Sequence, residues 1–266
     1  MAKVIAVVNQ KGGVGKTTTS INLSAALAQR RLRVLLVDLD PQGNASMGCG
    51  IDVENVDHSA YDLLTGSAYA ENIAVKDENL GFDVIAGGPD LTAAEVELME
   101  SDQRDKKLAE AMNVLQIVYD YVFIDCPPAL NILTVNALVA AQSILIPMQC
   151  EYYALEGLSA LMNTLADLRN TVNPNLKVEG LLRTMYDPRS NLTKDVSKQL
   201  EHYFKDQLFE TCIPRNVRLA EAPSHGLPIS QYDKSSRGAI AYNELAKEIT
   251  RRNRKTLKNQ NYSVSL

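Results

Sequence analysis

The residues with the clearest chemical signature form a glycine-rich segment close to the N-terminus. Its glycines allow tight turns that point successive backbone N–H groups at phosphate oxygens, and a helix starting at its end adds a positive dipole. Lys16 is placed to reach the β- and γ-phosphates of a nucleotide, and the Thr17 hydroxyl to complete a Mg²⁺ shell. We therefore expect eight residues to bind a nucleotide: Lys11, Gly12, Gly13, Val14, Gly15, Lys16, Thr17 and Thr18.

This segment departs from the usual phosphate-loop pattern G-x-x-x-x-G-K-[ST]. Gln10 occupies the position of the first glycine, and a second lysine, Lys11, follows it. Phosphoryl transfer to water depends mainly on positioning and on positive charge around the γ-phosphate. Lys16 and a Mg²⁺ ion would supply part of that charge. For Lys11, a surface lysine that only aids solubility is the alternative.

Three aspartates form the second group of candidate functional residues. Asp38, Asp40 and Asp125 each stand at or just beyond the C-terminal end of a short apolar run. The carboxyl ends of parallel strands form the edge where ligands bind in open sheets. Three carboxylates at one edge repel one another unless a cation or a polarised water lies between them. A purely structural cap at a strand end is the alternative for each of them.

The elements that must position these groups follow from apolar runs and helical periods. Residues 4–8 predict a strand, the pattern after the glycine-rich segment predicts a helix to Arg31, and residues 34–37 predict a second strand that ends at Asp38. Strand, loop, helix and strand within about 35 residues is a βαβ unit. Similar strands are expected at residues 121–124, 144–146 and 178–185.

Helical leucines at positions 155–168 lie between the later strands. The sequence therefore predicts an α/β fold, a mostly parallel twisted sheet with helices on both faces. We read residues 43–88 as surface helices and loops, and residues 1–254 as one domain. The final helix is expected over residues 237–254, with its apolar positions at Ile240, Leu245, Ala246 and Ile249. Residues 255–266 are expected to form a basic, disordered tail.

Charge is distributed unevenly along the chain. The 266 residues include 27 Lys and Arg against 32 Asp and Glu, a net charge of -5. Residues 1–180 have 12 basic and 23 acidic residues, whereas residues 181–266 have 15 and 9. The bulk acidity argues against a surface that is basic throughout, but the last third has a net charge of +6. Neither a signal peptide nor a membrane-spanning segment is predicted, and the four cysteines lack metal-ligand spacing.

Several segments together resemble the ParA/Soj partitioning branch of the ParA/MinD family, whose P-loop ATPases have a deviant Walker A motif. The resemblance covers essentially residues 1–254, and the matching segments occur in the expected order. They are KGGVGKTT at 11–18, DLDPQGNAS at 38–46, FIDCPP at 123–128, TMYDPRSNL at 184–192 and IPRNVRLAEAPSHG at 213–226.

The resemblance implies roles for individual residues. Lys11 corresponds to the signature lysine that reaches across a dimer to the partner's nucleotide, so an ATP-sandwiched homodimer is expected. Asp40 would orient the attacking water, and it joins Lys11 and Lys16 as a catalytic candidate. Asp125 resembles the Walker B aspartate, which with Thr17 and Asp38 would hold Mg²⁺, the two aspartates acting through water.

The same resemblance places the adenine. Pro214 and Asn216 would lie beside the base, with Thr184 and Met185 near them. The proline and methionine would supply apolar contact, and the Asn216 amide a specifying hydrogen bond.

At the level of function, the resemblance implies a slow ATPase that segregates DNA in chromosome or plasmid partitioning. An ATP-bound dimer would bind DNA without sequence preference, and a ParB-type centromere-binding partner would stimulate hydrolysis. Such a protein would be cytoplasmic and associated with the nucleoid, with no membrane partner. The expected DNA-binding residues, for which a solvated basic surface is the alternative, are Arg189, Arg218, Arg251, Arg252, Arg254 and Lys255.

Two other functions stay open on the sequence alone. A positioning ATPase of the MinD type would act at the membrane or on protein cargo, and would need an amphipathic helix with bulky apolar residues. A redox relative of the nitrogenase iron protein would hold an iron–sulfur cluster with cysteines. Cys126 directly follows Asp125, but the family pattern places the cluster ligands elsewhere.

Overall fold

The computed structural model describes the backbone of residues 1–263 and the side chains of residues 1–254. At its centre is a seven-stranded sheet in the order β3-β4-β2-β5-β1-β6-β7, in which only the pair β3 and β4 is antiparallel. The strands are β1 (Lys3–Val7), β2 (Val34–Asp38), β3 (Val75–Lys76), β4 (Asp83–Ile85), β5 (Tyr121–Asp125), β6 (Ser143–Gln149) and β7 (Lys177–Thr184). The predicted α/β fold is confirmed.

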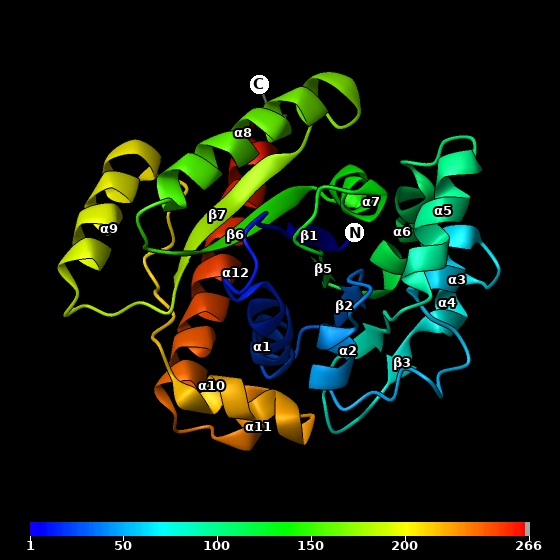
Figure 1. The fold of residues 1–266 in the computed structure, drawn as a ribbon, viewed down its shortest axis with the longest axis horizontal. Helices are drawn as coiled ribbons and strands as arrows, with labels where there is room; N and C mark the ends of the chain where they lie inside the picture. The colour runs from blue at the N-terminus through cyan, green and yellow to red at the C-terminus, as the bar shows by residue number, and fades with distance from the viewer. Residues whose placement is uncertain (264–266) are drawn as a thin grey trace.

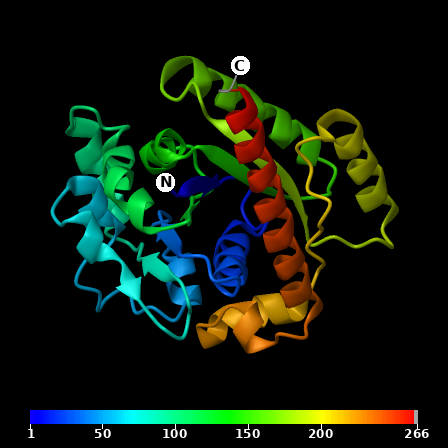
Figure 2. The same cartoon turned by 180° about the vertical axis from the view of Figure 1, so that it is seen from behind.

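Helices cover both faces of the sheet (Figures 1 and 2). Alternate strand residues point to opposite faces, so Ile5 and Val7 pack with α1 and α12, whereas Val4 and Ala6 pack with the helices of the other face. The helices with at least nine residues are α1 (Lys16–Ala28), α5 (Leu91–Glu100), α6 (Lys107–Val118), α7 (Ile132–Ala140), α8 (Ala154–Thr171), α9 (Asn191–Phe204) and α12 (Arg237–Ser263). The shorter ones are α2 (Asn44–Gly48), α3 (Ala60–Thr65), α4 (Ala70–Ile73), α10 (Val217–Glu221), the 3-10 helix η1 (Ala222–His225) and α11 (Ile229–Tyr232).

Strand register brings the predicted aspartates to one edge of the sheet. Asp38 at the end of β2 pairs with Asp125 at the end of β5, and Val7 at the end of β1 pairs with Asp125 from the other side. The chain between β1 and α1, which is the glycine-rich segment, therefore emerges next to both carboxylates.

Two strands, β3 and β4, lie where the sequence analysis expected only surface helices and loops. β4 extends the sheet beside β2, with Val84 and Ile85 fully buried. The strand has only three residues, and Gly81 and Gly87 flank it closely. So short an apolar run gives no alternation to detect, which is why the pattern missed it.

The C-terminal helix differs from expectation in two ways. α12 continues to Ser263 instead of ending near Arg254, and no Gly or Pro stands between these residues to stop it. Ile240 is 55% exposed, while Tyr242 is buried on the inner face of the helix. The predicted apolar positions Leu245, Ala246 and Ile249 are fully buried.

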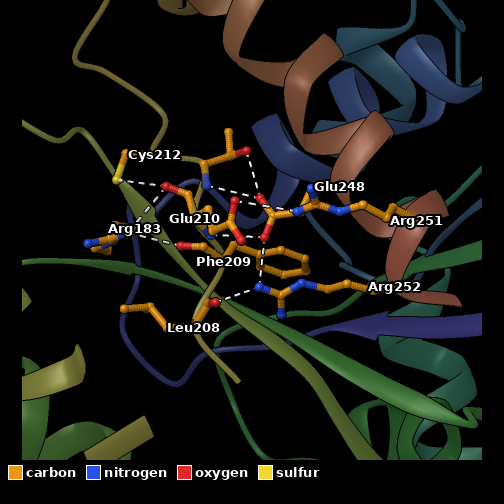
Figure 3. A network of polar contacts seen from close by, with 9 residues as sticks. Arg183, Leu208, Phe209, Glu210, Cys212, Glu248, Arg251 and Arg252 are labelled. Atoms are coloured by element: carbon orange, nitrogen blue, oxygen red, sulfur yellow. Dashed lines mark hydrogen bonds and ion pairs between the residues drawn. The ribbon is translucent and has the colours of Figure 1, made fainter. Parts of the chain in front are cut away.

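A partly buried polar network fastens α12 to the chain that follows α9 (Figure 3). Glu248 accepts hydrogen bonds from the backbone N–H groups of Glu210 at 2.9 Å and Thr211 at 3.0 Å. Arg252 donates to Glu248 at 2.7 Å and to the Leu208 carbonyl at 2.6 Å, and its guanidinium lies over the Phe209 ring. The helix is thus held to the β7 side of the sheet by charge-assisted hydrogen bonds.

The two edges of the sheet end in a short strand and in a partly covered one. At one edge stands the two-residue antiparallel β3, whose Lys76 side chain is exposed. At the other, the chain after α9 runs along β7: Leu181 N–H donates to the Gln207 carbonyl at 2.8 Å, and Phe209 N–H donates to the Leu181 carbonyl at 3.0 Å. Among the described helices, none has both the length and the apolar character required to cross a bilayer.

Candidate nucleotide-binding site

The glycine-rich segment forms a tight loop between β1 and α1. Gly13 has a φ of 73° and Gly15 a φ of 89°, in the region that only glycine adopts without strain. Gly15 occupies the N-cap position of α1, and no side chain caps this helix end. The N–H groups of the first turn of α1 are therefore left for another partner, which is the arrangement that binds phosphate.

Lys16 is the most buried basic residue of the loop, with 7% of its surface exposed. Burial lowers the pKa of its ammonium group, and the negative charges of Asp125 and Asp40 oppose that shift. Lys16 is thus a buried lysine at the start of α1 with two carboxylates near it.

Asp125 is fully buried and receives two side-chain hydrogen bonds from α1. Thr17 Oγ1 donates to its Oδ2 at 2.7 Å, and Ser20 Oγ donates to its Oδ1 at 2.7 Å. Burial raises the pKa of the Asp125 carboxyl, and the charge of Asp38 adds to the effect. The structure therefore brings Thr17 and Asp125 together, as expected, at a place where a cation would relieve buried negative charge.

Asp38 uses both of its carboxylate oxygens within the chain. Oδ1 accepts from the Asp40 N–H at 3.1 Å, and Oδ2 accepts from the Ser46 N–H at 2.9 Å and from Ser46 Oγ at 2.8 Å. Ser46 Oγ in turn accepts from the Gly87 N–H at 2.9 Å. Asp38 thus holds the segment from Asp40 to Ser46 in place, and its expected support of a metal-bound water stays a prediction.

Asp40 lies in a turn next to this carboxylate pair. Its Oδ1 accepts from the Gln42 N–H at 3.0 Å, and its carbonyl accepts from the Gly43 N–H at 2.8 Å. The side chain is mostly buried, with 8% of the residue exposed. Lys16, Asp38, Asp40 and Asp125 therefore form one compact group of charges in front of the phosphate loop.

Lys11 stands apart from that group. Its side chain is 52% exposed, and its ammonium forms an ion pair with Glu151, which is 47% exposed. The backbone N–H of Lys11 donates to Asn9 Oδ1 at 2.9 Å, which fixes the start of the loop. Within one chain, the lysine is thus paired at the surface.

A pocket with a volume of about 300 Å³ adjoins the loop on the α12 side. The four residues predicted to surround the adenine all line this pocket: Thr184, Met185, Pro214 and Asn216. Gly15 and Thr18 of the loop line it too. The contacts of these residues with a base stay predictions.

Two features of this pocket were missed by the sequence analysis. Tyr242, on α12, is 1% exposed and lines the pocket, and its hydroxyl lies 3.1 Å from Thr19 Oγ1. Asn216 is the N-cap of α10, and its Oδ1 accepts from the Arg218 N–H at 2.8 Å. More than 200 residues separate Tyr242 from the loop in sequence, so only the fold brings them together.

The predicted DNA-binding residues divide into two groups. Arg189, with a side chain 89% exposed, forms a two-point ion pair with Asp187, and Arg218 pairs with Glu221 at 2.8 Å. Arg251 is exposed and lies 3.4 Å from Glu210. Surface pairs of this kind are weak and exchange readily for other anions.

The other three basic residues follow Arg251 on α12. Arg252 belongs to the partly buried network in Figure 3, so its guanidinium already serves to attach the helix. Arg254 is exposed. The side chain of Lys255 lies outside the described residues. A contact of any of these residues with DNA stays a prediction.

Comparisons with known proteins agree with this geometry. A protein-family model described as an AAA domain matches residues 2–178. The chain is 52% identical over 251 residues to the sporulation initiation inhibitor protein Soj of Bacillus subtilis, covering 94% of this chain and 98% of Soj. It is 49% identical over 252 residues to the chromosome partitioning protein ParA of Myxococcus xanthus, covering 95% of this chain and 89% of ParA.

Solved structures share the fold. Cobyrinic acid a,c-diamide synthase from Mycobacterium smegmatis, solved with bound ADP and magnesium, superimposes with a TM-score of 0.81 at 36% sequence identity. The match covers 94% of this chain and 95% of that one.

Proposed function

This chain belongs to the ParA/Soj family of chromosome-partitioning ATPases, as its motifs predicted, and we propose that it is an ATP-driven switch for DNA segregation. In this proposal the ATP-bound form is a homodimer that binds DNA without sequence preference. Hydrolysis to ADP and phosphate, stimulated by a ParB-type centromere-binding protein, releases the DNA. The protein therefore acts in the cytoplasm, on the nucleoid.

The observation that carries this function is the compact group of charges in front of an uncapped helix. The first turn of α1 offers free N–H groups, and buried Lys16 adds a positive charge beside them. Both features favour a polyphosphate. The pocket beside the loop has room for a base, and Asn216 contributes an amide that can distinguish adenine by a hydrogen bond.

The residues present also fit Mg²⁺. This ion prefers oxygen ligands and keeps several waters, and Thr17 Oγ1 lies 2.7 Å from the fully buried carboxylate of Asp125. Thr17 would bind the ion directly, and Asp125 would hold it through water. When bound, the metal neutralises charge on the β- and γ-phosphates. Asp38 supports this arrangement by fixing the neighbouring segment.

Hydrolysis requires a positioned water and further positive charge at the γ-phosphate. Asp40 is the candidate that orients the water, because it is a buried carboxylate in a fixed turn close to Lys16. Lys11 is the candidate for the second charge. In a single chain Lys11 is exposed and forms a surface ion pair with Glu151. In a dimer, Lys11 can leave Glu151 and contact the nucleotide bound by the partner chain.

DNA binding is proposed for exposed basic residues outside the compact group of charges at the phosphate loop. Arg189 and Arg218 are half to fully exposed, and their acidic partners are surface residues. DNA phosphates can compete for such arginines, and binding of this kind weakens steeply with salt. A dimer presents two copies of a surface that binds DNA weakly. When ATP closes the dimer, avidity alone therefore raises its affinity for DNA.

A titration of double-stranded DNA tests this function. Fluorescence anisotropy with ATP, ADP or no nucleotide, at two salt concentrations, should give tight binding only with ATP and Mg²⁺, and weaker binding at high salt. Replacing Arg189 and Arg218 together by Glu should lower the affinity by at least about 10-fold. Equal affinity in all nucleotide states, or full affinity of the double variant, would contradict the proposal.

Liposome flotation separates this function from the membrane-acting alternative. With ATP, the protein should stay in the aqueous fraction and not float with anionic vesicles. The same preparation should bind labelled DNA in the anisotropy titration. Flotation with the vesicles in the absence of DNA binding would instead favour a positioning ATPase of the MinD type.

A further inference from the structure

Two glycines far apart in the sequence meet backbone to backbone. Gly50 has a φ of 76° and Gly226 a φ of 64°. A Cβ at Gly226 would lie 2.6 Å from the Gly50 Cα, and a Cβ at Gly50 would lie 3.1 Å from the Gly226 carbonyl oxygen. No side chain of either residue separates the two segments, and any larger residue at either position would push them apart.

On the Gly50 side, the contact leads directly to the candidate catalytic aspartate. α2 starts at Asn44, immediately after the turn that Asp40 fixes, and Asp38 holds its Ser46. The Gly50 N–H donates to the Met47 carbonyl at 2.9 Å, and the Ile51 N–H donates to the Ser46 carbonyl at 3.0 Å. A series of local hydrogen bonds therefore connects Asp40 to Gly50.

On the Gly226 side, the contact leads to the proposed DNA surface. Gly226 ends η1, and η1 continues α10, which carries Arg218, without a break. The Gly226 N–H donates to the Pro223 carbonyl at 3.0 Å, and the Leu227 N–H donates to the Ala222 carbonyl at 3.3 Å. A shift of Gly226 would therefore move α10 with it.

A cavity beside the contact leaves room for such a shift. It has a volume of about 190 Å³ and lies between α1, α2 and η1. Its walls include Thr17 and Thr18 of the phosphate loop, Asn44 at the start of α2, and Pro223. Figure 1 shows α2 close to the group of short helices that contains α10 and α11. Close packing holds the two segments together at the glycines, while the cavity lets them move together.

We propose that the Gly50–Gly226 contact is a joint that transmits the nucleotide state at Asp40 to the position of Arg218. It would set the DNA affinity of each chain, in addition to the avidity that a dimer provides. The proposal rests on the ATP-dependent DNA binding proposed above. Because coupling is reciprocal, DNA bound at Arg218 would also raise the affinity for ATP through the same joint.

The test compares two alanine substitutions at glycines with the same backbone conformation. Gly50→Ala strains the backbone and also opens the joint. Gly66→Ala is the matched control, because Gly66 has a φ of 75° but no atom lies within 4 Å of the place that an added methyl carbon would occupy. The DNA affinity of the wild type and of both variants is measured with ADP and with a non-hydrolysable ATP analogue, and dimer formation by sedimentation.

We expect Gly66→Ala to keep the wild-type ratio of the two affinities. Gly50→Ala should lower the ratio of the DNA affinity with the ATP analogue to that with ADP by about 5- to 10-fold. The affinity of this variant for the analogue itself, and its dimer formation, should stay within about twofold of wild type. An unchanged ratio in Gly50→Ala overturns the proposal that the Gly50–Gly226 contact transmits the nucleotide state. Loss of the dimer in this variant also overturns it, because the effect would then arise from association.

If the wild type binds DNA equally with both nucleotides, the proposed function itself fails, and this outcome is separate from failure of the joint. If Gly50→Ala does not fold, hydrogen exchange of the wild type decides. Exchange of the Gly226 and Leu227 amides should change between ADP and the analogue together with that of the Gly50 amide. Unchanged exchange at Gly226 and Leu227 overturns the proposal.

Discussion

The phosphate site depends on charged residues that the fold removes from water. Asp125 is fully buried and Lys16 nearly so, and each lowers the cost of burying the other. Hydrogen bonds from Thr17 and Ser20 then fix the orientation of the Asp125 carboxylate. The group is thus pre-organised, and its geometry does not have to form during the reaction.

Lys16→Ala should lose affinity for the nucleotide itself. The substitution removes the buried positive charge beside the α1 N-terminus, so we expect ATP to bind on the order of 10²-fold more weakly. Isothermal titration calorimetry measures this directly. Lys247→Ala, at an exposed lysine on α12, is the control and should bind ATP normally. Unchanged ATP affinity in Lys16→Ala would contradict the phosphate-loop assignment.

Asp40→Ala should separate binding from hydrolysis. The carboxylate is expected to orient the attacking water, so kcat should fall by about 10²-fold or more, while the ATP affinity changes little. A dimer should then accumulate in size-exclusion chromatography with ATP.

Asp52→Ala is the matched control for this variant, because Asp52 also accepts a hydrogen bond from the N–H two residues on, at 3.2 Å, but in an exposed turn. It should turn over normally. Normal turnover in Asp40→Ala as well would remove Asp40 from the reaction.

Among the elements, α12 connects the base pocket to the chain that runs beside β7. Tyr242 lines the pocket, and further along the same helix Glu248 fastens it to the chain beside β7. Partial burial would raise the pKa of Glu248, but hydrogen bonds from Thr211 and Glu210 and the charge of Arg252 outweigh it and lower the pKa.

Glu248→Gln should therefore destabilise the protein in a pH-dependent way. A lowered pKa in the folded state contributes stability that is present above the unfolded pKa and is lost as the pH falls through the folded pKa. We expect a loss of roughly 1–3 kcal/mol at about pH 7, and a smaller difference from wild type below about pH 4, near the ordinary pKa of glutamate.

Urea denaturation at both pH values measures the effect of this substitution. Glu244→Gln is the control, because Glu244 is 53% exposed and pairs only at the surface with Lys247. It should change the stability by less than about 0.5 kcal/mol. A Glu248→Gln effect that stays constant from neutral to acidic pH would show that charge does not cause it.

The sequence predicted those elements whose patterns are local. The strands that end at Asp38 and Asp125 and the leucine-rich helix α8 follow from runs and periods within one segment, and the phosphate loop follows from eight consecutive residues. β3 and β4 were missed because two and three residues are too few for a pattern.

Other parts of the site could not be read from local patterns because they depend on tertiary contacts. Ser46 meets Asp38 and Gly87 only through the fold, and Tyr242 reaches Thr19 from the opposite end of the chain. The same holds for Ile240, because helical spacing alone did not determine which face of α12 packs on the sheet.

At the scale of the whole molecule, the catalytic group is incomplete within one chain if Lys11 acts on a partner's nucleotide. Its surface ion pair with Glu151 has to be exchanged before it can do so. Hydrolysis per chain should therefore rise with protein concentration until the dimer is saturated. A constant specific activity over a dilution of about 100-fold would contradict this expectation.

Lys11→Ala should lower the activity at saturating protein concentration by roughly 10³-fold, as for a charge supplied in trans. Its affinity for ATP as a single chain should stay close to that of wild type, because Lys11 lies apart from the buried charges. Phosphate release assays across a protein dilution series, with nucleotide binding measured in parallel, check both statements. Arg33→Ala, at another exposed cation in a surface ion pair, is the control.

The edges of the sheet disfavour assembly of copies of this molecule through their strands. β3 has only two residues, one of them a lysine, and the chain after α9 already takes outer hydrogen bonds of β7 at Leu181 and Arg183. Short, charged and covered edges are the features that oppose edge-to-edge strand pairing between molecules. If copies assemble along DNA, we therefore expect side-chain contacts between helical and loop surfaces, which can be released again, and not a continuous sheet.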